Sequence, residues 1–353
     1  MLMVVFGAGA SHDSIPALPP KKQQDQPAGA AFYRPPLSNE LFADREPFST
    51  VLANYPQCHP IIPFLRHLEN TSVEEVLEEL QNEGKQYPAR IQQLAAVRYY
   101  LHHLLWVCDA AWSGHSLGIT NYRTLLDEIE LHRKQEEQVC IVTFNYDRLI
   151  EAALPTVGVD ITDLNAYISH PHYKLIKPHG SVNWARRVSN PMTNLGRSAM
   201  PIAQEIITLA PHLTITEEYR MVSQYPIATD GVNALFPAIS IPIQSKRDFE
   251  CPADHLKTLR DFIPKVDTLL LIGWSATQTA FLELLKQNLR QPVKGLIVAG
   301  STEEAARVAY SMDAQGLKFN FYYTSGGFSD FIITREYRNF IRNLREETTS
   351  ARA

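Results

Sequence analysis

Four short clusters of glycine and polar residues carry the side chains of this 353-residue chain that are suited to chemistry. Each cluster directly follows an apolar stretch, and the clusters cover residues 7–11, 143–147, 178–181 and 273–275. Glycine lets the backbone approach a ligand closely, and a turn that opens a helix leaves N–H groups for a phosphate. The amide, carboxylate and imidazole groups of the other clusters can orient a substrate or accept a proton. Taken singly, each cluster also fits an ordinary turn or helix cap.

The apolar stretches before the clusters predict the elements that must position them. Residues 2–6, 139–144 and 268–272 are almost entirely apolar, which is typical of strands buried on both faces of a parallel sheet. Such strands alternate with helical segments along the chain, so we expect an α/β fold with a Rossmann-like, doubly wound parallel sheet. In an open α/β sheet the ligand crevice lies at the carboxyl ends of the strands. The four clusters are therefore expected to converge on one pocket.

The rest of the chain is expected to form insertions into this one domain, which spans residues 1–353. A helical insertion is predicted at about 37–135 and an irregular, proline-punctuated insertion at about 186–265. Within the first, Ser72 and Glu75 have the spacing of a capping box. His102 and His103 have no partner at metal-ligand spacing, so we interpret them as packing or surface histidines.

The bulk composition excludes several classes of protein. A formal net charge of −5 gives no support for a general nucleic-acid-binding surface. No apolar run is long enough to span a bilayer and no signal peptide is evident, so a cytoplasmic protein without membrane attachment is expected. The four cysteines, Cys58, Cys108, Cys140 and Cys251, contain no C-x-x-C pair. A zinc ribbon, any other metal site and a disulfide framework are therefore not expected.

A simple dehydrogenase is a weak interpretation of the first cluster. Its fingerprint needs a third glycine and an acidic residue after a second strand, about twenty positions on. Here His12 occupies the third glycine position, and the following residues 19–24 do not read as a strand.

The order of the clusters, GAGxS, TxNxD, HGS and GxS, resembles the sirtuin (SIR2) superfamily. Residues 36–42, 72–75 and 177–184 are similar to the bacterial SIR2-like branch, and the resemblance is weakest from about 187 to 234. Two features depart from the protein deacylases: the zinc-ribbon cysteines are absent, and residues 14–16 lack the G-I-P-D-F-R pattern. These departures favour a resemblance to the SIR2-like NAD-cleaving effectors of bacterial antiphage defence, including the HerA-associated type.

This resemblance implies a role for each cluster. Asn145 would hold the nicotinamide ribose and place the attacking water, and Asp147 would orient the nicotinamide carboxamide. His179 would be the general base, because the ordinary pKa of histidine lies near neutral pH. The remaining residues would bind the rest of NAD+: Gly7, Ala8, Gly9 and Ser11 at the pyrophosphate, Gly273 and Ser275 beside the adenosine half, and Thr143, Gly180 and Ser181 elsewhere along the ligand.

The activity expected from the resemblance is hydrolysis of NAD+ to nicotinamide and ADP-ribose, as a toxic antiphage effector. Such an enzyme must be controlled, and we expect a homo-oligomer regulated by assembly or by a partner such as a HerA-like ATPase or another phage-sensing subunit. Two alternatives remain open. One is an NAD-dependent protein deacylase or ADP-ribosyltransferase, and the other is a non-catalytic nucleotide-binding sensor subunit.

Overall fold

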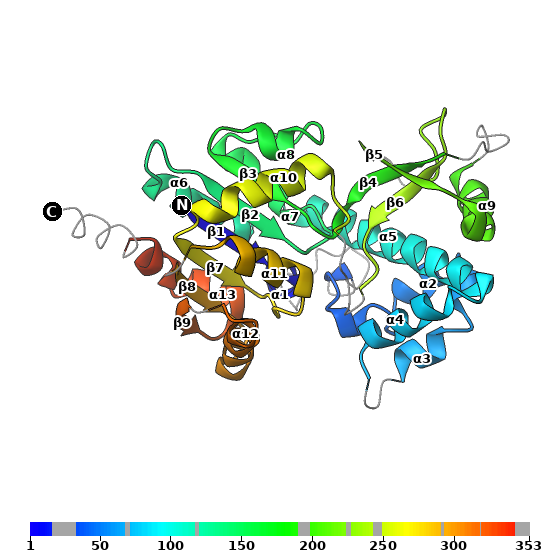
Figure 1. Ribbon diagram of the computed structural model, residues 1–353, viewed down its shortest axis with the longest axis horizontal. Coiled ribbons are helices and arrows are strands. Elements are labelled where there is room, and N and C mark those ends of the chain that lie inside the picture. The colour runs from blue at the N-terminus through cyan, green and yellow to red at the C-terminus, as the bar shows by residue number, and fades with distance from the viewer. Residues whose placement is uncertain are drawn as a thin grey trace, which may run out of the picture. The chain divides into compact units, whose positions relative to one another are not determined.

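The computed structural model describes residues 1–15, 33–67, 71–116, 120–189, 198–223, 227–242, 249–290, 293–317 and 319–342. The chain forms two compact units, each built from separate segments. The first contains Met1–Ala17, Trp112–Pro178 and Ala253–Ala353, and the second contains Leu18–Ala111 and His179–Pro252. Figure 1 labels the helices and strands of both.

The first unit is built on a six-stranded sheet in the order β3-β2-β1-β7-β8-β9, in which every pairing is parallel. Each residue of β1, β2 and β7 is buried, because helices cover both faces of the sheet. The sheet confirms the predicted doubly wound α/β fold. Its strands are β1 (Leu2–Phe6), β2 (Val139–Thr143), β3 (Tyr173–Ile176), β7 (Thr268–Ile272), β8 (Val293–Val298) and β9 (Phe319–Thr324).

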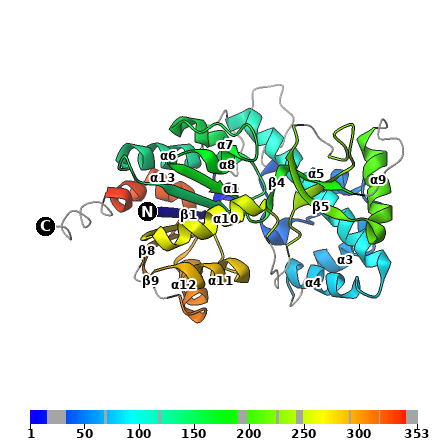
Figure 2. The same cartoon turned by 45° about the horizontal axis from the view of Figure 1, so that its top comes forward.

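Helices of this unit lie on the two faces of the sheet. Helices α1, α6 and α13 contact one another, whereas α12 lies beside β8 and β9, as Figure 2 shows. Helix α13 follows β9, the last strand of the sheet, and packs with α1 and α6 near the start of the unit. The helices are α1 (Ala8–Asp13), α6 (Asn121–His132), α7 (Leu149–Ala153), α8 (Ala166–Ser169), α10 (Ala253–Phe262), α11 (Thr279–Asn288), α12 (Thr302–Ala314) and α13 (Gly327–Ile333), with 3-10 turns η4 (Leu154–Val157) and η6 (Ile263–Lys265).

The strand order has one switch point. From β1 the chain builds β2 and β3 on one side, and β7, β8 and β9 then extend the sheet from the other side of β1. Figure 1 shows β1, in dark blue, in the middle of the sheet. In open α/β sheets, ligands bind outside the carboxyl ends of the strands at the point where the order reverses. That point here lies between the ends of β1 and β7.

The second unit contains a three-stranded antiparallel sheet in which β4 (Gly180–Val188) lies between β5 (Ile215–Met221) and β6 (Leu235–Ile239). Ser72 and Glu75 form the predicted capping box at the start of α4, with hydrogen bonds of 3.1 and 2.9 Å. The helices and 3-10 turns are η2 (Ser38–Glu40), α2 (Phe48–Leu52), η3 (Pro56–Cys58), α3 (Ile62–Arg66), α4 (Val73–Glu83), α5 (Pro88–Ser116), whose last residues belong to the first unit, α9 (Ala199–Leu209) and η5 (Ala210–His212).

Helix α5 is fixed to the small sheet by buried polar contacts. His102 is 1% exposed, and its Nε2 lies 2.6 Å from the Val182 carbonyl oxygen on β4. Burial lowers the pKa of His102 to about 4, so this histidine is neutral at physiological pH and donates that hydrogen bond. The packing role predicted for His102 is confirmed.

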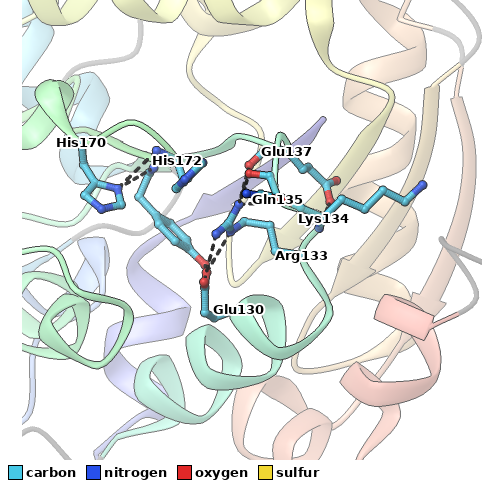
Figure 3. A network of polar contacts seen from close by, with 8 residues as sticks. Glu130, Arg133, Lys134, Gln135, Glu137, His170 and His172 are labelled. Carbon is cyan, nitrogen blue, oxygen red and sulfur yellow. Dashed lines mark hydrogen bonds and ion pairs between the residues drawn. The ribbon is translucent and has the colours of Figure 1, made fainter.

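At the amino ends of β2 and β3, a polar network ties α6 to the loop that follows it (Figure 3). The Arg133 guanidinium donates two hydrogen bonds to Glu130, at 2.9 and 3.0 Å, and the Tyr173 hydroxyl donates to the same carboxylate at 2.7 Å. Arg133 also donates to three carbonyls that follow the helix, those of Lys134, Gln135 and Glu137. The network lies at the edge of the sheet opposite the predicted ligand crevice, and its role is to end α6 and start β2.

Candidate functional site

The turns that follow β1 and β7 are packed directly against each other at the switch point. Gly7 N–H donates to the Ile272 carbonyl at 3.0 Å, and Gly9 N–H donates to the Gly273 carbonyl at 3.1 Å. A Cβ on Gly7 would lie 2.5 Å from the Gly273 carbonyl oxygen, and one on Gly273 would lie 2.3 Å from the Ala10 nitrogen. Gly7 and Gly273 are therefore required because the two backbones approach each other too closely to leave room for a side chain.

This packing uses two of the N–H groups that the sequence predicts as phosphate contacts. The N–H groups of Gly7 and Gly9 are already donated to carbonyls of the β7 end. Of the phosphate contacts predicted from the sequence, those of the Ala8 N–H group and the Ser11 hydroxyl stay predictions. A side chain on Gly9 would meet the Gly273 backbone at 3.0 Å, so its first effect would be on the turn itself.

Three buried side chains from three different elements meet beside this turn. Asn145, after β2, donates from Nδ2 to the Ser11 Oγ at 2.8 Å and to the Tyr122 hydroxyl at 3.3 Å. The oxygens of Ser11 and Tyr122 are themselves 2.8 Å apart. All three residues are at most 6% exposed, yet the Asn145 Oδ1 has no hydrogen-bond partner among the described residues. We refer to Ser11, Tyr122 and Asn145 as the polar triad.

Aromatic packing holds the tyrosine of this triad in place. The Tyr122 ring lies 4.8 Å from the Phe6 ring and 5.4 Å from the Phe328 ring, both with edge-on geometry. Burial and then the nearby Asp147 carboxylate raise the pKa of Tyr122 well above its ordinary value. The phenol is therefore a permanent hydrogen-bond donor.

The loop after β2 is held by hydrogen bonds at both ends. Thr143 Oγ1 accepts from the Asn145 N–H at 3.2 Å, and Asp147 Oδ1 accepts from the Leu149 N–H at 3.0 Å at the start of α7. The fully buried Lys177 donates to the Asp147 carbonyl at 2.5 Å and to Glu151 at 2.8 Å. The Asp147 carboxylate thus binds the first N–H group of α7, and its role in the site stays a prediction.

Aromatic side chains pack together after the carboxyl ends of β2 and β7. The Phe144 and Trp274 rings are stacked with centroids 5.8 Å apart and an interplanar angle of 7°, and Phe281 packs edge-on against both. The Trp274 indole N–H donates to Gln278. Next to Trp274, Ser275 is exposed, and its hydroxyl lies 3.2 Å from that of Thr277. The predicted adenosine-side residues, Gly273 and Ser275, therefore flank a rigid aromatic side chain.

The other predicted site residues belong to the second unit. The His179 carbonyl accepts from the Ser240 N–H at 2.8 Å, and Ser181 is fully buried. Gly180 has φ of +82°, and a Cβ there would lie 1.9 Å from the Ala238 carbonyl oxygen, so this position requires glycine. The convergence of His179 with Asn145 stays a prediction from the sequence.

Tyr122 and Lys177 contact residues of the candidate site, although the sequence predicts no role for either of them. Tyr122 lies in α6, and no motif or spacing links it to the glycine turn. Lys177 directly follows β3, and a lysine at the end of a buried strand is a signal that could have been used.

Two kinds of feature are not found in the part of the chain that the structure describes. No helix there is long and apolar enough to cross a membrane. No group of three or more histidine, cysteine, aspartate or glutamate side chains there is arranged to hold a metal ion.

Comparison of the whole chain with protein-family models gives no match, and comparison with curated protein sequences gives none either. The fold is similar to solved structures of Sir2 homologues. A mutant Sir2 homologue in complex with ADP-ribose is 15% identical, with a TM-score of 0.39, over 99% of this chain and 93% of that one. A Sir2 homologue–NAD complex is 13% identical, with a TM-score of 0.37, over 98% and 90% of the two chains. A Sir2–p53 peptide–NAD+ structure is 12% identical, with a TM-score of 0.34, over 99% and 93%.

Proposed function

We propose that this protein is an SIR2-like NAD+ hydrolase that releases nicotinamide and ADP-ribose. The observation that carries the proposal is the Asn145 Oδ1, a buried acceptor without a partner among the described residues, beside the switch point of the sheet. A buried polar atom without a partner is costly, so its retention favours a ligand that supplies a donor. A ribose hydroxyl or a water molecule is such a donor. The cluster order GAGxS, TxNxD, HGS and GxS resembles the sirtuin superfamily, and that resemblance favours NAD+ among nucleotides.

The proposed reaction breaks the bond between the nicotinamide nitrogen and the ribose C1′. The electron pair of that bond returns to the nicotinamide ring, which leaves as a neutral molecule, so the leaving group needs no general acid. Water forms the new bond to C1′, and its proton passes to His179, the proposed general base. Asn145 positions the ribose and the water, and Asp147 orients the carboxamide of nicotinamide.

The fit of the ligand to this chain rests on the turn and the polar triad. The Ala8 N–H and the Ser11 hydroxyl are the proposed contacts of the pyrophosphate, and Gly273 and Ser275 border the adenosine half. Thr143, Gly180 and Ser181 complete the proposed contact set.

Substitution of Asn145 and of His179 tests the proposal. We expect Asn145→Ala and His179→Ala each to lower NAD+ cleavage about a hundredfold or more, as for loss of a general base. The measurement is chromatographic detection of nicotinamide and ADP-ribose, with Tyr99→Phe as a folded control, because Tyr99 hydrogen-bonds the Leu235 carbonyl within the second unit. Cleavage at the wild-type rate by both variants would refute the assignment.

Control by assembly is part of the proposed function. A constitutive NADase would be toxic, so we infer a cytoplasmic homo-oligomer of low activity, released by a HerA-like ATPase or another phage-sensing subunit in antiphage defence. Light scattering in parallel with NAD+ assays tests this inference. A fully active monomer that needs no partner would contradict it.

A further inference from the structure

The polar triad contains one arrangement of hydrogens that satisfies all its contacts. The Asn145 Nδ2 lies within 3.3 Å of the Ser11 and Tyr122 hydroxyl oxygens, and these two oxygens lie 2.8 Å apart. Each of these three pairs of atoms needs one hydrogen to form a hydrogen bond. With the Asn145 nitrogen turned toward the hydroxyls, its two hydrogens and one hydroxyl hydrogen supply all three. With the amide reversed, the two hydroxyl hydrogens supply two at most, and the NH2 group has no acceptor. The count of donors and acceptors therefore requires the Asn145 amide oxygen to face away from Ser11 and Tyr122.

The same count leaves one of the two hydroxyl hydrogens without a hydrogen bond inside the polar triad. The Tyr122 oxygen contacts Ser11 and Asn145, and its ring is enclosed by Phe6 and Phe328. A spare hydrogen on Tyr122 would have no acceptor among the described residues, so Tyr122 donates to Ser11 and the spare hydrogen belongs to Ser11. The triad then offers an acceptor at Asn145 and a donor at Ser11.

We propose that Tyr122 is a positioning residue that fixes the Asn145 amide and the Ser11 hydroxyl for a ligand containing a ribose and a phosphate. This inference rests on the proposed function. A ribose hydroxyl donates to the Asn145 oxygen, and a phosphate oxygen accepts from the Ser11 hydroxyl. Tyr122 touches neither group and acts through both partners.

Tyr122→Phe removes one oxygen and keeps the aromatic packing. Without the phenol, the Asn145 amide retains a single fixed hydrogen bond, and the Ser11 hydroxyl is free to turn inward. We expect affinity for ADP-ribose, measured by titration calorimetry, to fall about tenfold, in keeping with the loss of one or two oriented hydrogen bonds. Tyr99→Phe, which removes another buried phenol hydrogen bond of 2.9 Å, is the matched control and leaves the affinity unchanged.

A second measurement uses the protein without ligand. In protein labelled with 15N-asparagine, the side-chain NH2 signal of Asn145 is identified by its loss in Asn145→Asp. We expect slow hydrogen exchange of both NH2 hydrogens in the wild type and faster exchange in Tyr122→Phe, with no change in Tyr99→Phe. Ser11→Ala serves as a second variant at the other partner, and combining it with Tyr122→Phe is expected to weaken ADP-ribose binding less than the sum of the two single effects.

The outcomes separate the two proposals. Unchanged NH2 exchange in Tyr122→Phe overturns the positioning role directly. Unchanged ADP-ribose affinity in that variant, with normal binding by the wild type, overturns it as well and leaves the proposed function intact. Absence of ADP-ribose and NAD+ binding by the wild type overturns the proposed function, and the ligand-facing part of this inference with it.

Discussion

Replacing Lys177 by methionine removes the cation that holds the loop after β2. Lys177 Nζ lies 2.5 Å from the Asp147 carbonyl oxygen and 2.8 Å from Glu151 Oε1, and the two charged side chains are 0% and 8% exposed. Methionine has a similar length and no charge. The Glu151 carboxylate would then keep the Tyr167 hydroxyl, at 3.1 Å, as its remaining contact in this cluster.

The expected magnitude follows from this burial. Loss of one partner of a buried ion pair lowers the free energy of unfolding by about 3–5 kcal/mol, because the other charge remains buried without compensation. Glu151→Leu should cost a similar amount for the same reason. The double variant Lys177→Met/Glu151→Leu removes both charges and loses mainly the hydrogen bonds from Tyr167 and to Asp147, about 1 kcal/mol each. The two substitutions should therefore be coupled by at least about 3 kcal/mol.

Urea unfolding at pH 7, followed by circular dichroism, measures this coupling through the four members of the cycle. The matched control is Lys257 and Asp261, an ion pair of 2.6 Å whose side chains are 72% and 60% exposed. We expect no measurable coupling for that pair, since solvent screens exposed charges. If the losses of unfolding free energy caused by Lys177→Met and Glu151→Leu were additive, the reasoning would be refuted. It holds that each buried charge destabilises the protein only when the other charge has been removed.

Three further outcomes are expected. Burial lowers the pKa of His102 to about 4 from its ordinary value of 6.5, so as the pH falls the unfolded chain binds a proton first, and stability is lost from pH 6.5 toward pH 4. By pH 5 this histidine should account for a loss of about 2 kcal/mol, absent in His102→Gln, when urea unfolding at pH 7 and pH 5 is compared. Gly273→Ala should destabilise far more than Gly231→Ala in thermal melts, because both glycines have positive φ but a Cβ at Gly231 meets nothing within 4 Å; equal losses would contradict this. Arg133→Lys should cost about 1 kcal/mol in urea unfolding, because lysine lacks the fork that binds Glu130, and an unchanged midpoint would argue against it.

The parallel sheet was predictable because its central strands are almost entirely apolar. Residues 2–6, 139–143 and 268–272 bury both faces, which is the pattern of a doubly wound sheet. The small antiparallel sheet was not predictable in the same way. Strand β5 reads ITEEYRM, with mostly exposed or half-buried positions, and forms at the edge of a sheet through pairing with β4. Such pairing depends on tertiary contacts that local sequence does not encode.

The candidate site was predictable where motifs follow strands and was missed where packing decides. Ser11 and Asn145 were both assigned to one ligand, and the structure joins them by a hydrogen bond of 2.8 Å. Tyr122 was missed because it is 111 residues from Ser11 and its position depends on the rings of Phe6 and Phe328. The roles of the predicted site residues in binding and catalysis remain predictions.

The central place of β1 has a consequence for how the protein is made. Strand β1 pairs with β2 on one side and with β7 on the other, in register from Leu2 with Val139 and Thr268. At about 5–20 residues per second, a ribosome needs roughly 13–50 s to make the ~260 residues between β1 and β7. Until then one edge of β1 has no partner, and an unpaired apolar edge invites aggregation. The glycine turn also cannot close before Gly273 emerges, because Gly7 and Gly9 donate hydrogen bonds to the carbonyls of Ile272 and Gly273.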